Sequence, residues 1–343
     1  MRAAIVWSLL LLGAAPSDTR LPVHIGGRVV READGALRFG WPGVYVEAHF
    51  RGTGVTVAAE PKGEQLALLI DGKRRQVLSG LAPARVKIDG LAPGEHVVRL
   101  EKLTETQTGS VRFLGFWPTE GGQPRKAKAR ARQIEFIGDS HTVGYGDTAS
   151  TRTCTREQVH DTTDTQQAFG PLLAKRLDAD YRVIAYSGYG IVRNYNGGVP
   201  GDSLPKRYPR AIPGEDAPEA ASDWQPQLVV INLGTNDFST PVHAGEPWKD
   251  LDALRADYRT SYTAFVRTLR AKYPHAHFLL LGPDLFYRDV AEVAAQVGGP
   301  VVALHLAPLE LTGCDWHPSL KDQRAMADEV GKAAAAMPRL WGH

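Results

Sequence analysis

Hydrophobic and polar residues alternate in short runs through the first part of the chain. Between Leu21 and Pro118, these runs are separated by turn pairs such as Asp71-Gly72 and Pro93-Gly94. Alternation with period two places apolar side chains on one face of a strand and polar side chains on the other. Many short strands of this kind predict an antiparallel, jelly-roll-like β-sandwich over residues 20–120.

The pattern changes after residue 132, where continuous apolar runs alternate with longer amphipathic segments. Buried parallel strands are apolar throughout, whereas the helices that cover them are apolar only every three or four positions. We therefore expect an α/β domain over residues 133–343, with a parallel sheet in a flavodoxin-like three-layer arrangement. The predicted strands are Gln133–Ile137, Arg182–Tyr186, Leu228–Leu233, His277–Leu281 and Val301–Leu306, and the predicted helices are Thr165–Leu177, Leu251–Lys272, Leu285–Val297 and Ser319–Met337.

A basic segment joins the two predicted domains. Its run PRKAKARAR, which ends at Arg132, lies between two differently patterned regions, so we interpret residues 121–132 as a solvated linker rather than a polyanion site. The chain has 343 residues and a formal net charge of only +2. This near balance gives little electrostatic basis for binding nucleic acid or an anionic membrane, and we expect neither partner.

The first residues have the pattern of a secretory signal peptide. One positive charge, at Arg2, precedes an apolar run that ends in the small residues Gly13, Ala14 and Ala15. The run is shorter than the ~20 residues that a membrane-spanning helix needs. We therefore expect residues 1–19 to be a cleaved signal peptide and the mature protein to be secreted or periplasmic. We also expect it to be a monomer.

Polar residues gather at the ends of the predicted strands. GDS with Ser140 follows the first strand, SGYG with Gly188 the second and GTND with Asn236 the third, while HPS with His317 precedes the last helix. Because the carboxyl ends of parallel strands meet at one edge of a sheet, these four segments should lie close together.

These residue types suit nucleophilic attack on a carbonyl carbon. The hydroxyl of Ser140 needs a base, which His317 can provide, and donors for the oxyanion that forms. The expected donors are the backbone N–H groups of Ser140 and Gly188 and the side-chain amide of Asn236, with Gly190 as the alternative to Gly188. Each residue alone also suits an ordinary cap or turn. Their joint occurrence at strand ends favours a catalytic site.

Neighbouring residues receive structural interpretations. We expect His141 to point away from Ser140, as a residue of the site rim or of the solvent-facing surface, and Asp139 and Asp237 to act as local caps. Ser187 lacks the GxSxG elbow that exposes a nucleophile in α/β-hydrolases. Aromatic residues near the four segments are candidates for stacking on sugar rings, about half of them being core residues. They are Tyr189, Tyr195, Trp224, Phe238, Trp248 and Trp316.

Two cysteines, Cys154 and Cys314, flank segments of this candidate site. An oxidising compartment permits them to pair, so we predict a disulfide between them. Two widely separated cysteines without paired ligand spacing make a poor tetrahedral zinc site. We expect neither a metal nor an organic cofactor.

The ordered set of Ser140, Gly188, Asn236 and His317 resembles the GDSL/SGNH hydrolase superfamily. With the strand-rich domain in front and the tract GCDWHP near the end, nearly the whole mature chain is similar to carbohydrate esterase family two. The resemblance implies a secreted two-domain acetyl esterase that acts on acetylated plant polysaccharides such as xylan and mannan. Of the aromatic residues near the four segments, we expect Tyr189 and Trp316 to contact the substrate.

The chain departs from the superfamily pattern at the position three residues before His317. Cys314 stands where the acid of a catalytic triad is usual, and Asp315 lies two residues before the histidine. Either Asp315 reaches Nδ1 of the imidazole, or a backbone carbonyl orients the ring and the site works as a Ser-His dyad. Two other functions remain open: a lipase or thioesterase on the same scaffold, and a non-catalytic carbohydrate-binding protein.

Overall fold

The alternating segments of the first part form two antiparallel sheets packed face to face. The computed structural model describes residues 19–342 except residues 108, 128, 218 and 220–222, and residues 1–18 of the predicted signal peptide lie outside the described residues. Apolar side chains such as Val46, Phe50, Val57 and Phe116 fill the space between the sheets. One sheet contains β1 (His24–Gly26), β4 (Tyr45–Gly52), β9 (Gly94–Lys102), β6 (Leu66–Ile70) and β7 (Lys73–Leu78), with β11 (Gln123–Arg125) on β4; the other contains β2 (Val30–Arg31), β3 (Leu37–Phe39), β10 (Val111–Pro118), β5 (Val55–Glu60) and β8 (Ala84–Ile88).

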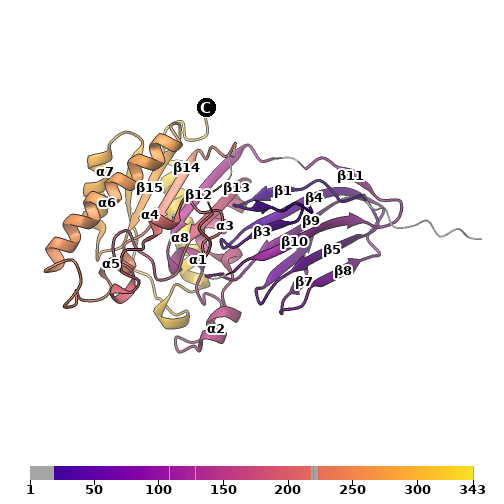
Figure 1. The fold of residues 1–343 in the computed structure, drawn as a ribbon. Helices are drawn as coiled ribbons and strands as arrows, with labels where there is room; N and C mark the ends of the chain where they lie inside the picture. Colours follow the sequence, from indigo (N-terminus) through magenta and orange to yellow (C-terminus); the bar gives the residue numbers. More distant parts are fainter. Residues whose placement is uncertain (1–18, 108, 128, 218, 220–222, 343) are drawn as a thin grey trace, which may run out of the picture.

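The second part is a five-stranded parallel sheet with helices on both faces (Figure 1). The strand order is β13-β12-β14-β15-β16, which is the order of flavodoxin-like folds. The sandwich and the parallel sheet confirm the predicted fold class. The strands are β12 (Arg132–Gly138), β13 (Ala179–Ala185), β14 (Leu228–Asn232), β15 (His277–Gly282) and β16 (Val301–His305).

Alternate residues of each parallel strand face different helices. Phe136 packs in a cluster with residues of α3 (Phe169–Arg176) and α8 (Leu320–Ala335), whereas Ile137 belongs to the cluster of α6 (Leu251–Lys272) and α7 (Tyr287–Val297). The four long helices therefore occur where the amphipathic pattern predicts them. Shorter helical turns lie in the loops: α1 (Ser140–Val143), α2 (Arg156–Asp161), η1 (Thr165–Gln167), η2 (Tyr195–Gly197), α4 (Leu204–Arg207), α5 (Thr235–Phe238) and η3 (Cys314–Trp316).

The segment interpreted as a solvated linker is partly structured. Residues Gln123–Arg125 form β11, which pairs with β4 of the sandwich. The Arg130 guanidinium contacts Glu47 of the sandwich at 3.2 Å and Asp180 of β13 at 3.0 Å. The described residues of this segment are exposed or half-buried, as expected of a linker, but the pairing of β11 and the ion pairs of Arg130 also attach it to both parts of the chain. Across the described residues, no helix is long and apolar enough to cross a membrane.

Candidate active site

The four predicted segments meet at the carboxyl edge of the parallel sheet. Ser140 begins α1 directly after β12, and Gly188 follows β13. Asn236 lies in α5 after β14, and His317 follows η3 just before α8. The Asp139 carboxylate caps α1 by accepting the His141 N–H at 3.0 Å. This strand-to-helix corner holds Ser140 at the sheet edge.

Ser140 and His317 are in direct hydrogen-bond contact. Nε2 of His317 lies 2.8 Å from Oγ of Ser140. Nδ1 of the same ring lies 2.9 Å from the Cys314 carbonyl and 3.1 Å from the Asp315 carbonyl. Because a carbonyl only accepts, Nδ1 carries the proton and Nε2 is left to accept the serine proton. Burial lowers the pKa of His317, which keeps the ring neutral and able to act as a base.

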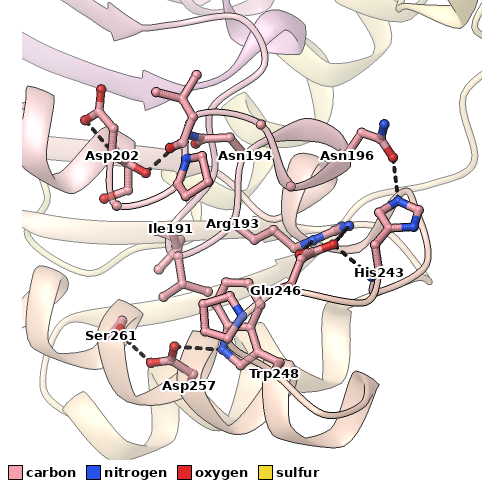
Figure 2. A pocket seen from close by; sticks show the side chains of 18 of the residues that line it. Ile191, Arg193, Asn194, Asn196, Asp202, His243, Glu246, Trp248, Asp257 and Ser261 are labelled. Atoms are coloured by element: carbon pink, nitrogen blue, oxygen red, sulfur yellow. Dashed lines mark hydrogen bonds and ion pairs between the residues drawn. The ribbon is translucent and has the colours of Figure 1, made fainter.

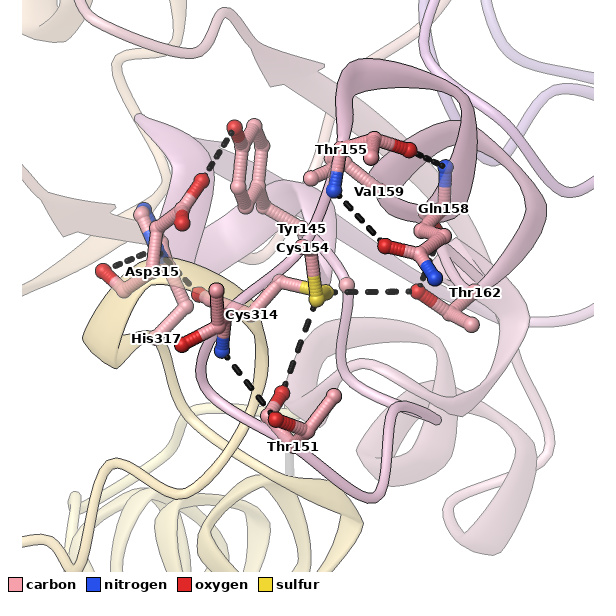
Figure 3. Close-up of a disulfide and its surroundings, with 12 residues drawn as sticks. Tyr145, Thr151, Cys154, Thr155, Gln158, Val159, Thr162, Cys314, Asp315 and His317 are labelled. Carbon is pink, nitrogen blue, oxygen red and sulfur yellow. Dashed lines mark hydrogen bonds between the residues drawn. A yellow bond between two sulfur atoms is a disulfide. The ribbon is translucent and has the colours of Figure 1, made fainter.

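The Asp315 side chain points away from the back of the imidazole. Its carboxylate accepts the Tyr145 hydroxyl at 3.2 Å, as Figure 3 shows. The Tyr145 ring packs on the His317 ring at 4.3 Å between centroids. Of the two alternatives for orienting His317, the structure therefore has backbone carbonyls, not a carboxylate, at Nδ1.

The predicted disulfide between Cys154 and Cys314 is present and lies beneath this loop (Figure 3). Cys314 is fully buried. The next residue is also held, because the Asp315 N–H donates to the Arg152 carbonyl at 2.7 Å. The disulfide and this hydrogen bond thus link the segment that follows α1 to the loop whose carbonyls contact His317.

Gly188 and Gly190 differ in whether their backbone N–H is available to bind an oxyanion. The N–H of Gly190 donates to Asn194 at 3.2 Å, and a side chain there would meet the Arg193 carbonyl at 2.3 Å. Gly188 has a positive φ of 84° and open space where a side chain would stand. Its N–H has no hydrogen-bond partner among the described residues. The geometry favours Gly188 over Gly190.

The Asn236 amide is held at the same edge. Nδ2 donates to the Tyr189 carbonyl at 2.9 Å and lies 3.4 Å from the Asp139 carboxylate. The neighbouring Asp237 carboxylate accepts backbone N–H groups from Ile191 to Arg193 at 2.9 to 3.0 Å. Burial raises the pKa of Asp139 to about 7 and that of Asp237 to about 6. Both carboxylates hold loops, in agreement with the expectation of local caps.

Two aromatic rings pack beside His317. His141, expected at the rim of the site or in solvent, is half-buried, and its ring packs edge-on against His317 at 5.5 Å between centroids. Burial and the neighbouring His317 lower the pKa of His141 to about 3, so it stays neutral. The sequence did not identify Tyr145 as a site residue, because its local pattern has no distinctive motif. Its contact with the imidazole depends on the position of η3 in the folded protein.

The candidate sugar-stacking aromatics divide between surface and core. Trp316 is 63% exposed, and the Arg152 guanidinium lies 3.8 Å from its ring centroid. Tyr195 is 58% exposed. Tyr189, expected at the substrate, is largely buried with its hydroxyl 3.2 Å from Asp202. Trp224 and Phe238 are also buried, so about half of the set belongs to the core, as expected.

A cavity of about 760 Å³ lies beside the catalytic edge (Figure 2). Two loops form it, residues 191–206 and residues 243–248, and α6 closes one side. Arg193 and Glu246 pair across the loops at 2.5 Å, and His243 contacts Asn196 at 2.6 Å. The cavity wall does not include Ser140 or His317. No group of three or more histidine, cysteine or acidic side chains in the described parts of the chain is arranged to hold a metal ion.

Both parts of the chain match known families. Residues 25–127 match the model of the carbohydrate esterase 2 N-terminal domain, and residues 136–336 match the GDSL-like lipase/acylhydrolase family. The acetylxylan esterase / glucomannan deacetylase of Cellvibrio japonicus is 44% identical over 329 residues, which cover 92% of this chain and 91% of that protein.

Solved structures agree with these matches. A family two carbohydrate esterase from Clostridium thermocellum in complex with cellohexaose has a TM-score of 0.79 and 31% identity, over 91% of this chain and 98% of that one. A family two carbohydrate esterase from Cellvibrio japonicus has a TM-score of 0.81 and 25% identity, over 94% and 96% of the two chains. The predictions of a carboxylic ester hydrolase and of carbohydrate deacetylation are confirmed at the level of the family. The chain belongs to carbohydrate esterase family two, with a GDSL-like hydrolase as its second part.

Proposed function

We propose that this chain removes acetyl groups from acetylated plant polysaccharide, xylan or glucomannan, through an acetyl-enzyme on Ser140. The observation that carries the proposal is the 2.8 Å contact between Ser140 Oγ and His317 Nε2 at the edge where Gly188 and Asn236 also lie. The name of the Cellvibrio japonicus relative supports the choice of xylan and glucomannan.

The geometry suits a two-step acyl transfer. His317 takes the Ser140 hydroxyl proton at Nε2 while Oγ attacks the acetyl carbonyl carbon. The carbonyl oxygen becomes an oxyanion, and the N–H groups of Ser140 and Gly188 and one N–H of Asn236 stabilise it. The oxyanion then collapses, the bond between the acetyl carbon and the sugar oxygen breaks, and His317 gives its proton to that oxygen, which leaves as a hydroxyl group.

Water completes the reaction by the same route. His317 removes a proton from water, the hydroxide attacks the acetyl carbonyl, and Ser140 leaves with the proton returned from Nε2. The Cys314 and Asp315 carbonyls hold Nδ1–H throughout, so they keep Nε2 aimed at Ser140 and stabilise the transient imidazolium. The site therefore works as a Ser-His dyad.

The test is acetate release from acetylated xylan, acetylated glucomannan and an aryl acetate, with Ser140→Ala as the control. We expect Ser140→Ala to lower kcat on the aryl acetate by at least ~10³, since only binding and oxyanion stabilisation remain. Unchanged kcat in a folded variant would refute the mechanism. Hydrolysis of long-chain acyl esters in preference to acetyl esters would favour a lipase or thioesterase, and glycan binding without acetate release would favour a non-catalytic binding protein.

We propose that the enzyme acts outside the cytoplasm, secreted or periplasmic, as a monomer. The predicted signal peptide supports this location. So does the disulfide between Cys154 and Cys314, because such bonds persist in oxidising compartments. Trp316, exposed at the rim near His317, is the surface we propose for contact with the sugar chain.

A further inference from the structure

A segment of the sandwich reaches the loop that contains Gly188. The Glu105 carboxylate accepts the Ser187 N–H at 2.7 Å. The Gln107 side chain donates to the Ser187 carbonyl at 3.3 Å, and the Gln107 carbonyl accepts the Tyr186 hydroxyl at 3.1 Å. The sandwich thus contacts both the N–H and the carbonyl of the residue that precedes Gly188.

These contacts restrain the peptide group that carries the Gly188 N–H. The Ser187 carbonyl and the Gly188 N–H belong to one planar peptide and point in opposite directions. Fixing the carbonyl oxygen therefore fixes the direction of the N–H. Local structure also contributes, because the Tyr189 N–H donates to the Tyr186 carbonyl at 3.3 Å and the Tyr195 N–H donates to the Gly188 carbonyl at 2.8 Å. Gly188 itself, with a left-handed φ of 84° and no side chain, adds no packing contact, so the bonds from the sandwich supplement this turn.

Partial burial of the Glu105 carboxylate costs desolvation free energy, which indicates that this residue has a function here. It is partly buried, and burial raises the pKa of its carboxyl group. A sequestered carboxylate needs hydrogen-bond donors, and the Ser187 N–H is one of them. Tyr186, whose ring packs edge-on against Tyr189 at 4.5 Å, supports the other side of the loop.

We propose that Glu105 and Gln107 are positioning residues for ester hydrolysis. Glu105 anchors the Tyr186–Ser187 peptide through the Ser187 N–H, and Gln107 contacts the carbonyl of the Ser187–Gly188 peptide, so that together they keep the Gly188 N–H facing the oxyanion. The sandwich then completes the catalytic site of the hydrolase part. This inference rests on the proposed function, because it requires an oxyanion at Gly188. Preorganised donors act mainly on the charged transition state, so the effect belongs in kcat rather than in KM.

The test is steady-state kinetics on an aryl acetate. We expect Glu105→Ala to lower kcat by roughly 10- to 100-fold with KM changed less than about threefold. Glu105→Gln keeps an acceptor oxygen and should recover kcat to within about threefold of the parent. Gln107→Ala removes an exposed side chain, so it should fold normally and lower kcat by about threefold.

The matched control is Gln65→Ala. Gln65 also belongs to the sandwich and donates to the hydrolase part, at Asp161 and 3.1 Å, but it lies outside the contacts with residues 186–188. We expect its kcat to match the parent, which separates a positioning effect from a general weakening of the interface. Thermal unfolding of each variant shows whether it is folded.

Three outcomes would overturn the inference: parental kcat in folded Glu105→Ala, equal losses in Glu105→Ala and Glu105→Gln, or an equal loss in Gln65→Ala. If Ser140→Ala abolishes turnover while Glu105→Ala does not, the inference alone fails. If Ser140→Ala retains turnover, the proposed function fails first.

Discussion

The orientation of His317 depends on main-chain atoms of its own loop. Its Nδ1 faces the Cys314 and Asp315 carbonyls, while the Asp315 carboxylate is bonded to Tyr145. Carbonyl dipoles keep the productive tautomer but stabilise an imidazolium less than a carboxylate does. The arrangement separates the role of the Asp315 backbone from that of its side chain.

We therefore predict unequal effects for two variants at this loop. Asp315→Asn leaves the backbone carbonyl in place and should lower kcat on an aryl acetate by less than ~10², whereas His317→Ala should lower it by more than ~10³. Equal and severe losses from both changes would make Asp315 a full member of a triad. Kinetics across a range of pH distinguishes a lost base from a shifted pKa.

The pH dependence of the reaction tests the surroundings of the imidazole. His317 must be neutral to act as a base, and burial lowers its pKa below the ordinary 6.5. Activity is therefore kept as the pH falls to 6.5 and is lost only as it falls further, through the lowered pKa. We expect kcat/KM on an aryl acetate to be half-maximal below pH 6.5.

Tyr145 offers a matched pair of variants for this pH profile. Tyr145→Ala uncovers the His317 ring and should move the midpoint upward towards 6.5, because water then stabilises the imidazolium. Tyr145→Phe keeps the covering ring and should leave the midpoint near that of the parent. An unchanged midpoint in Tyr145→Ala would show that the Tyr145 ring does not set the pKa.

Residues marked by sequence motifs could be predicted, and residues that act through tertiary contacts could not. Ser140 and His317 stand in recognisable tracts at the ends of elements, so their meeting followed from topology. Glu105 follows a sandwich strand, and its contact with Ser187 depends on how the two parts of the chain dock. The contact of the His141 ring with His317 could not be predicted for a similar reason, since the two residues lie 176 positions apart in the chain.

At the scale of elements, the disulfide ties η3 to the segment before α2. Without it, the carbonyls of Cys314 and Asp315 would be held mainly by the contacts of Gly146 and Arg152. We expect Cys154→Ala combined with Cys314→Ala to lower the free energy of unfolding by about 2–5 kcal/mol, because the bond closes a long loop of the unfolded chain. The measurement is urea unfolding.

The same double variant should also lower kcat several-fold in conditions where it is fully folded, since His317 loses its fixed support. Thiol reduction of the parent should reproduce the loss, and the double variant should not respond to thiol. Parental kcat in the double variant would show that the hydrogen bonds of η3 alone suffice to orient His317.

Elements with a long periodic pattern were predicted well, and short irregular ones were not. The predicted α6 matches the structure at both ends, Leu251 and Lys272. At its N-terminus, the Asp250 side chain caps the helix by accepting the Ala253 N–H at 2.9 Å. By contrast, β11 is a three-residue strand in a basic, proline-containing run, and only its partner β4 makes it a strand. Local pattern carries no information about such a partner.

At the scale of the whole molecule, charged residues join the sandwich to the parallel sheet, which lie side by side in Figure 1. Asp180 at the start of β13 is central. It accepts the Tyr45 hydroxyl at 2.5 Å, contacts His24 at 2.8 Å and pairs with Arg130 at 3.0 Å. Its side chain is 2% exposed, so these partners replace nearly all of its water. The sandwich and the parallel sheet are therefore joined by a specific polar interface rather than by a flexible linker.

Removing the Asp180 charge should destabilise this interface. Asp180→Asn removes one of the three carboxylates that contact Arg130 and leaves Glu47 and Asp178 in place. Breaking a buried pair typically costs about 3–5 kcal/mol, so we expect a loss near the lower value by urea unfolding at pH 7. The matched control is Asp178→Asn, because Asp178 pairs with the same arginine at 3.3 Å but is 90% exposed. The control should change the free energy of unfolding by less than about 1 kcal/mol.

The pH dependence of the difference in unfolding free energy between the parent and Asp180→Asn gives an independent check. Burial alone would raise the pKa of Asp180, but hydrogen bonds from His24 and Tyr45 lower it to about 2. Because the folded-state pKa lies below the unfolded one, the Asp180 contribution is complete above about pH 4 and is lost as the pH falls towards 2. The parent and Asp180→Asn should therefore converge in stability over that range. A difference that stays constant down to pH 2 would mean that the carboxylate charge does not hold the two parts together, and that packing around Tyr45 does.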